Sequence, residues 1–232
     1  MTPAEMLSRV LYKDQDVIVL NKPAGLAVHA GPNSPDHLEL YLDALCYGWA
    51  EPPRLAHRLD RDTAGCLILG RHDKAIKRLG KMFAAHRIDK LYWSVSIGSP
   101  PTDTGTVDAP ILKVSAKGQG WRIRIDPAGQ PAITDWSVIG RYGELTWIEW
   151  RPRTGRTHQI RVHAKHLGCP LLGDRYYGAD PDTLAPLHLL ARAVAIPPLA
   201  PSKPPIRVSA PPPDHMRDAL TACGWNGHMD AS

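Results

Sequence analysis

Short apolar runs that end at glycine or proline constrain the fold of this chain more than any other feature. Residues 16–22 (DVIVLNK) stop before Pro23 and Gly25, and residues 66–70 (CLILG) form a second compact apolar run. Runs of this length are typical of buried strands, because helices of globular proteins need more residues. With 19 glycines and 23 prolines in 232 residues, the chain has enough turn formers to join many such strands.

Two segments instead have helical spacing and the end signals of helices. Residues 73–86 place apolar side chains three and four residues apart, and Asp73 is predicted to cap the start. Residues 157–167 (THQIRVHAKHL) begin at Thr157, a suitable N-cap, and end before Gly168. Alternating patterns predict further strands at 91–97, 121–125, 133–139, 144–150 and 187–196. Many strands with few helices predict an α+β domain on a largely antiparallel sheet.

The composition and length of the chain indicate a folded globular protein. Hydrophobic residues make up 43% of the chain and charged residues 22%, which is ordinary for a folded protein and excludes wholesale disorder. The length fits one large domain or two closely joined halves. The proline-rich residues 197–213 are expected to form a constrained, extended tail rather than core, and a short helix is expected near 214–223.

Charge is concentrated in two basic blocks, although the formal net charge is only +5. Between Arg54 and Lys90 there are ten lysines and arginines against four aspartates, and between Trp150 and Gly173 there are five against none. These blocks either build one electropositive groove for a polyanion or remain two solvated faces. Charge alone does not decide between the two.

Cysteine spacing and hydropathy argue against other classes of protein. The four cysteines form no CxxC pair, which argues against structural zinc and a disulfide framework, and fits reduced thiols in a cytoplasm. The N-terminus has no signal-peptide core, and no apolar run is long enough for a membrane span. The expectation is a soluble cytoplasmic protein, with a monomer as the default.

Residues 57–65 (HRLDRDTAG) are the first segment that can carry chemistry. Asp60 lies between Arg58 and Arg61 just before a predicted strand, so the scaffold holds the loop and the cations favour an ionised carboxylate. Such a carboxylate is a candidate nucleophile. The alternative is a surface turn in which Asp60 and Asp62 only pair with the two arginines.

Residues 154–163 (TGRTHQIRVH) are the second such segment. On the predicted helix His158, Arg161 and Lys165 share one face, at spacings of three and four residues. Arg161 is expected at the boundary between the wet and the buried side, where a guanidinium can grip a carboxylate or a phosphate. The alternative is a solvated basic helix face. No metal site is expected, because His158 and His163 diverge by about 140° on a helix.

Tyr92 is the third candidate. On the strand predicted at 91–97, Lys90 and Tyr92 point to the same side. A tyrosine beside cations can move a proton or stack on a base. The alternative is an ordinary sheet tyrosine with a satisfied hydroxyl.

The order and spacing of these motifs resemble those of one enzyme family. NKPAGLAVH (21–29), HRLDRDTAG (57–65), KLY (90–92) and TGRTHQIRVHAKHLGCPLLGDRYYG (154–178) together resemble the RluA-type family of RNA pseudouridine synthases. The resemblance runs from about Tyr12 to Pro197. It implies the pseudouridine synthase α+β fold, a long, bent, mostly antiparallel sheet with flanking helices and a central catalytic cleft. The whole of 1–232 would then be one catalytic domain.

The resemblance also implies roles for individual residues. Asp60 would be the catalytic nucleophile, Tyr92 would stack on the target base and act in proton transfer, and Arg161 would pair with Asp60. The residues that contact RNA would be Arg58, Arg61, Arg156, His158 and Lys165. The substrate would be a uridine in structured rRNA or tRNA, extruded from its stack, with no metal, cofactor or obligate protein partner. Whether the intermediate is covalent or a glycal stays open.

Departures from the family pattern and competing functions complete the expectations. The family loop commonly has serine where Ala64 stands, and the chain begins close to the catalytic domain, without the small N-terminal RNA-binding domain of many relatives. Target recognition would then come from the two basic blocks. One alternative is a catalytically silent RNA-binding or RNA-chaperone protein on the same fold. The other is a glycosidase that uses Asp60 and Asp62, although residues two apart in one tight loop are poorly placed across a sugar.

Overall fold

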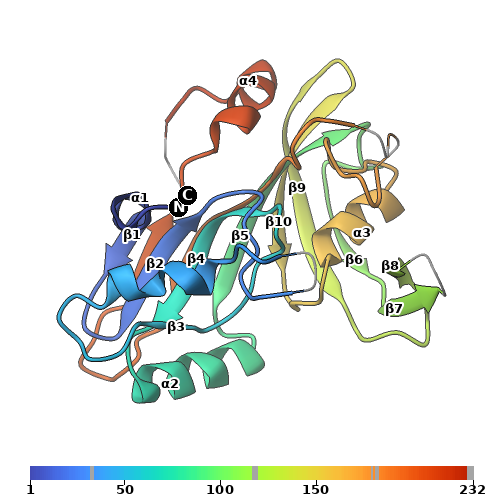
Figure 1. The fold of residues 1–232 in the computed structure, drawn as a ribbon. Helices are drawn as coiled ribbons and strands as arrows, with labels where there is room; N and C mark the ends of the chain where they lie inside the picture. The colour runs from blue at the N-terminus through green and yellow to red at the C-terminus, as the bar shows by residue number, and fades with distance from the viewer. Residues whose placement is uncertain (32–33, 117–119, 179, 181–182, 229–232) are drawn as a thin grey trace. The chain divides into compact units, whose positions relative to one another are not determined.

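The computed structural model describes residues 1–31, 34–116, 120–178, 180 and 183–228. The chain divides into two compact units (Figure 1). The first unit comprises Met1–Lys90 and Ala191–Pro212, and the second comprises Leu91–Leu190 and the segment that begins at Pro213. The mixture of mostly antiparallel strands with a few helices confirms the predicted α+β class.

The first unit is built on a small sheet. Its elements are α1 (Pro3–Ser8), β1 (Val10–Lys13), β2 (Val17–Lys22), the 3₁₀ helix η1 (Leu38–Leu45), β3 (Arg54–Leu55), β4 (Ala64–Gly70), α2 (Asp73–Ala84), most of β11 (Leu189–Ile196) and β12 (Ile206–Ser209). The strand order is β1-β2-β4-β11, with β3 on β4 and β12 on β11. The pairs β1–β2, β2–β4, β3–β4 and β11–β12 are antiparallel. The two compact apolar runs of the sequence are therefore the neighbouring strands β2 and β4.

The central strand β4 is buried over its whole length, which explains its uninterrupted apolar sequence. In β2 the burial extends from Val17 to Leu20 and resumes at Lys22. Helix α2 packs against β4 through its buried face, which is formed by Ala75, Leu79 and Met82. The lysines of α2 remain exposed on the opposite side, as expected for an amphipathic surface helix.

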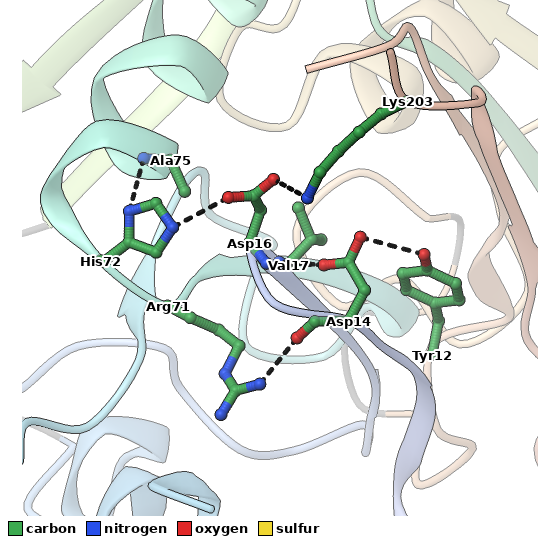
Figure 2. Close-up of polar contacts among 8 residues, drawn as sticks. All are labelled: Tyr12, Asp14, Asp16, Val17, Arg71, His72, Ala75 and Lys203. Atoms are coloured by element: carbon green, nitrogen blue, oxygen red, sulfur yellow. Dashed lines mark hydrogen bonds and ion pairs between the residues drawn. The ribbon is translucent and has the colours of Figure 1, made fainter. Parts of the chain in front are cut away.

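The predicted cap of α2 is wrong by one residue. The N-cap is His72 rather than Asp73, because the Nδ1 atom of His72 accepts a hydrogen bond from Ala75 N at 3.2 Å (Figure 2). Asp73 instead begins the helix, where its negative charge suits the positive end of the helix dipole. The imidazole supplies the acceptor that a short polar side chain usually provides.

The second unit contains a four-stranded antiparallel sheet with the order β5-β10-β9-β6, and a separate hairpin. Its elements are β5 (Asp89–Ile97), β6 (Thr104–Asp108), β7 (Ile111–Ala116), β8 (Gly120–Ile125), β9 (Ile133–Tyr142), β10 (Leu145–Pro152), α3 (Gln159–His166) and α4 (Asp214–Ala222). Strands β7 and β8 pair only with each other among the described strands. All five strands predicted from alternating patterns are confirmed, as is the short C-terminal helix.

Aromatic side chains dominate the core of the second unit. Trp136 of β9 and Trp150 of β10 pack with Ile160 and Ala164 of α3. Trp150 is fully buried, and its indole Nε1 donates to Ser94 Oγ at 2.8 Å, so the one polar atom of the ring is satisfied. Burying an indole removes roughly 150–250 Å² from water, which is worth about 4–6 kcal/mol. This cluster seats α3 firmly on the sheet.

The proline-rich stretch differs from its prediction. Residues 197–213 contain β12, and Leu199, Ile206, Val208 and Ala210 are buried. The prolines lie on both sides of β12 and so do not interrupt its hydrogen bonds to β11. The segment therefore adds an edge strand to the first unit instead of forming a tail. No helix in the described part of the chain is long and apolar enough to cross a membrane.

Candidate functional site

The HRLDRDTAG loop joins β3 to β4 in the first unit. The side chain of Leu59 is buried, whereas those of Arg58 and Arg61 are exposed. Asp60 is partly buried at the start of a turn that Thr63 N closes on Asp60 O at 3.2 Å. The loop therefore turns its apolar residue inward and leaves its acid and its two cations accessible.

Lys22, the last residue of β2, lies beneath this loop and is fully buried. Its ammonium Nζ donates to the carbonyl oxygens of Pro23 and Leu26, both at 2.8 Å, and of Arg61 at 2.9 Å. Burial lowers the pKa of Lys22 to about 7, against the opposing pull of Asp62 and Asp60. One buried amine thus ties the HRLDRDTAG loop to the NKPAG turn.

Two further contacts hold the loop. Arg61 Nε donates to Gly25 O at 3.0 Å, a second link to the NKPAG turn. His57 Nε2 accepts a hydrogen bond from Ile68 N at 2.9 Å, and its ring packs 4.7 Å from the ring of Phe83. Burial, with a smaller contribution from Lys90, lowers the pKa of His57 to about 3, so the ring is a neutral acceptor at physiological pH.

Lys22 is a residue that the sequence analysis missed as part of the site. The proline and glycine of the NKPAG motif by themselves indicate only a turn, and a lysine at the end of an apolar run normally reaches solvent. The available signal was the position of Lys22 at the buried end of a strand that leads into a glycine and proline turn. The sequence alone does not show that the NKPAG turn and the HRLDRDTAG loop both contact this lysine.

Helix α3 begins two residues later than predicted. It starts at Gln159, and Thr157 is exposed and does not cap it. His158 takes the N-cap position in the left-handed conformation (φ 55°), and its side chain makes no capping hydrogen bond. Instead His158 Nδ1 lies 2.8 Å from Tyr177 Oη. The side chain of Gln159 accepts from Arg156 N at 2.9 Å, which ties the segment before the helix to its first residue.

Arg161 is buried rather than at the wet boundary, with only 3% of its side chain exposed. Its Nε and Nη2 donate to the two carboxylate oxygens of Asp174 at 2.8 and 2.7 Å. Burial would raise the pKa of Asp174, but hydrogen bonds from Arg161 and from the main-chain N–H groups of Tyr176 and Tyr177 outweigh it and lower that pKa. A buried guanidinium is tolerable here because this internal carboxylate neutralises it.

Asp174 belongs to the GDRYYG motif (173–178), whose two glycines by themselves indicate only a turn. Its role as the partner of a buried arginine was missed, because residues thirteen apart reveal no contact without the fold. The rings of Tyr176 and Tyr177 both have the Arg161 guanidinium carbon 5.2 Å from their centroids. The motif therefore surrounds the arginine with a carboxylate and two aromatic faces.

The remaining predicted residues take different positions in the second unit. Tyr92 lies on β5 opposite Trp150 of β10, and it is partly buried against the aromatic core. Arg156 is exposed, and its Nε donates to Pro131 O at 3.2 Å. Lys165 is exposed on α3, so it does not share the buried environment of Arg161.

The predicted catalytic residues are thus divided between the units: Asp60 with Arg58 and Arg61 in the first, and Tyr92 and Arg161 in the second. The predicted pairing of Asp60 with Arg161 stays a prediction. Within the described ranges, no group of three or more histidine, cysteine, aspartate or glutamate side chains could hold a metal ion.

Comparison with known proteins gives one consistent result. Residues 16–166 match the family model described as RNA pseudouridylate synthase. The chain is 40% identical to an uncharacterised RNA pseudouridine synthase of Zymomonas mobilis, over 92% of this chain and 97% of that protein. It is 39% identical to ribosomal large subunit pseudouridine synthase D of Yersinia pestis over 77% of this chain, and the match spans 55% of that longer protein.

Solved structures agree with the sequence matches. The human RNA pseudouridylate synthase domain containing 4 protein superposes with a TM-score of 0.79 at 27% identity, over 95% of each chain. The related human domain containing 1 protein gives 0.73 at 27% identity, over 92% of this chain and 86% of that one. A family model that covers most of the chain, with relatives of this identity and coverage, shows that the chain belongs to the RNA pseudouridylate synthase family.

Proposed function

We propose that this chain isomerises specific uridines in rRNA or tRNA to pseudouridine, with Asp60 as the nucleophile. Family membership makes the chain an isomerase that acts on RNA. The observation that carries the residue assignment is the loop geometry, in which Asp60 is accessible while the loop around it is fastened to the buried Lys22. A nucleophile must be rigidly held and still reach its substrate, and this loop meets both requirements.

The reaction breaks the bond between ribose C1′ and uracil N1 and makes a bond between C1′ and uracil C5. The proton on C5 is lost, and N1 gains a proton, so no redox partner or group donor is needed. Asp60 acts on the ribose, through either a covalent adduct or a glycal. Because the reacting atoms of a stacked nucleotide are inaccessible, the uridine must first be extruded into the site.

Tyr92 and Arg161 are the other proposed catalytic residues. We propose that Tyr92 stacks on the extruded base and takes part in removing the C5 proton, and that Arg161 pairs with Asp60. The bidentate contact with Asp174 occupies Nε and Nη2 of Arg161 and holds the guanidinium in a fixed plane.

RNA recognition is proposed to use exposed cations around these residues. Arg58 would fill the space left by the extruded nucleotide. The further contacts to RNA are assigned to Arg61, Arg156, His158 and Lys165. The name of the Yersinia pestis relative refers to the large ribosomal subunit, which favours rRNA, and tRNA is the second candidate. The proposed working form is a cytoplasmic monomer without cofactor.

Release of tritium from RNA that contains 5-tritiated uridine tests this function, because the C5 hydrogen leaves only when pseudouridine forms. Cells that lack the protein supply rRNA and tRNA with the target uridine unmodified. We expect Asp60→Asn to abolish release while RNA binding persists, and the matched variant Asp62→Asn to retain most of the activity. If the wild-type protein binds these RNAs and releases no tritium, the silent RNA-binding alternative holds.

A further inference from the structure

Two exposed aromatic rings lie among cations at the end of the first unit that is away from the catalytic loop. Tyr47 is 38% exposed and Trp49 is 44% exposed. Lys13 Nζ lies 3.8 Å from the Tyr47 ring centroid, and the Arg71 guanidinium carbon lies 5.2 Å from the Trp49 ring centroid. The His72 ring stacks on Trp49 at 5.6 Å with an interplanar angle of 17°. We call these five residues the Trp49 patch.

Arg71 and His72 of the patch are held in place by hydrogen bonds. Arg71 Nη1 donates to Asp14 O at 2.7 Å (Figure 2). Its Nη2 donates to Cys46 O at 3.4 Å. His72 Nδ1 accepts from Ala75 N, so its Nε2 carries the proton and donates to Asp16 Oδ1 at 2.8 Å. The side chains beside Trp49 are therefore anchored by the main chain and by a neighbouring carboxylate. A preorganised surface loses little entropy when it binds a ligand.

The loop that carries the aromatic rings has an uncommon backbone. Tyr47 has φ 48° and Gly48 has φ 83°, so two successive residues are left-handed. This conformation is unfavourable for a residue with a side chain such as tyrosine. Main-chain strain of this kind concentrates at functional sites, because the fold must hold it in place.

Three carboxylates near the patch are engaged by neighbouring groups. Asp16 contacts Lys203 as well as His72 (Figure 2), and Asp73 pairs with Arg54. Asp14 accepts from its own loop, at Asp16 N and Val17 N. The exposed lysines that follow on α2 are Lys74, Lys77 and Lys81. The result is a platform of aromatic and cationic side chains next to a basic helix.

The strand register locates this platform relative to the catalytic loop. Val17 pairs with Gly70 at the patch end of β2 and β4, and Lys22 pairs with Gly65 at the loop end. Five residues of strand separate the two ends, which is about 17 Å. A ligand that contacts both sites must therefore be extended and several nucleotides long.

We propose that the Trp49 patch binds an unpaired stretch of the substrate RNA, at a distance from the target uridine. Unpaired bases stack on aromatic and guanidinium planes, and flanking cations hold the phosphates, so this surface matches single-stranded RNA in both respects. Trp, Tyr and Arg are also enriched at protein–protein interfaces, whereas lysine is depleted at them. The exposed lysines next to the patch therefore favour a polyanion over a protein partner. The inference rests on the proposed function only in taking RNA as the substrate.

Fluorescence anisotropy with a labelled, unstructured oligoribonucleotide of about 12 nucleotides tests the patch. We expect Trp49→Ala to weaken binding about tenfold, and Trp49→Phe to restore most of the affinity, because phenylalanine also stacks. Leu40→Ala, at a residue of the same unit that is 58% exposed, is the matched control and should leave binding unchanged. A hairpin duplex of equal length should bind with little dependence on Trp49.

A second measurement needs no variant. Bound oligoribonucleotide should protect Trp49 from oxidative labelling in the wild-type protein, and unbound protein should be labelled there. Unchanged affinity in Trp49→Ala together with unprotected Trp49 would overturn the proposal and leave the patch to a protein partner. Asp60→Asn separates this test from the proposed function: it should retain Trp49-dependent binding after tritium release is lost. Trp49-dependent binding without any isomerisation would refute the proposed function alone.

Discussion

The two motifs that carry the proposed catalytic residues are held in opposite ways. In the first unit, Asp60 stands on a loop whose Arg61 carbonyl oxygen accepts from the buried amine of Lys22, and that amine also donates to the carbonyl oxygens of Pro23 and Leu26. In the second unit, the side chain of Arg161 is itself buried and bound at two points by Asp174. Lys22 supports the loop through a main-chain carbonyl group, whereas in α3 the side chain of Arg161 itself makes the supporting contacts.

This difference has a consequence for mutations. A change at Asp60 leaves the hydrogen bond from Lys22 to Arg61 O in place, so we expect activity to be lost while most of the stability persists. A change at Arg161 or Asp174 leaves an uncompensated charge inside the second unit, where desolvation is costly. Function and stability are therefore separable in the first motif and coupled in the second.

The largest expected effect is on the stability of the second unit. Asp174→Asn should lower the free energy of unfolding by about 3–5 kcal/mol, because it removes the counter-charge of a guanidinium that is 3% exposed. Urea unfolding followed by tryptophan fluorescence measures the change. The exposed pair Arg54–Asp73 provides the control, and Asp73→Asn should cost about 1 kcal/mol or less, because an exposed ion pair and a helix-dipole contact are both weak. An equal loss of unfolding free energy in Asp174→Asn and Asp73→Asn would contradict the view that the buried pair supports the second unit.

Lys22→Met tests the first motif. The variant removes three hydrogen bonds to carbonyl groups but also removes the cost of burying an amine, so the change in unfolding free energy should stay within about 2 kcal/mol. The loop loses its anchor, and a displacement of about 1 Å at Asp60 should reduce tritium release about 100-fold. Full activity in a folded Lys22→Met protein would show that the loop does not depend on this lysine.

Features that depend on neighbouring residues in the sequence could be predicted, whereas those that depend on contacts between distant residues could not. The strands were predictable because alternation and short apolar runs are local signals, as in β4 and β8. The Asp60 loop was found because its motif is contiguous in the sequence. Lys22 and Asp174 were missed because each acts through a contact that only the fold creates, from Lys22 to Arg61 and from Arg161 to Asp174. Arg161 was misplaced at the boundary for the same reason.

A smaller effect on stability is expected from His57, the first residue of the HRLDRDTAG loop. The unfolded imidazole of a histidine titrates near 6.5, and the pKa of folded His57 is lowered to about 3. The unfolded chain therefore binds more protons between these values, so this contribution to stability is complete above pH 6.5 and is lost as the pH falls toward 3. The slope from one such group is at most about 1.4 kcal/mol per pH unit.

His57→Gln keeps an acceptor for Ile68 N but cannot take up a proton. Its unfolding free energy should therefore fall by about 1 kcal/mol less than that of the wild-type protein between pH 6.5 and 5.5. Urea unfolding at both pH values measures the difference, and the other buried histidines cancel because both proteins contain them. Parallel curves would mean that His57 is not the neutral anchor of the loop.

The smallest effects compare the starts of the two helices. His72 caps α2 through Ala75 N, so His72→Ala should cost about 1 kcal/mol of unfolding free energy. Thr157→Ala should cost nothing measurable, because α3 begins after His158 and Gln159 provides the hydrogen bond to Arg156 N. The motif pattern alone predicts the reverse, since threonine is a favoured N-cap and histidine is not. A loss of about 1 kcal/mol in Thr157→Ala would place the cap of α3 at Thr157 after all, and would make the two helix starts alike.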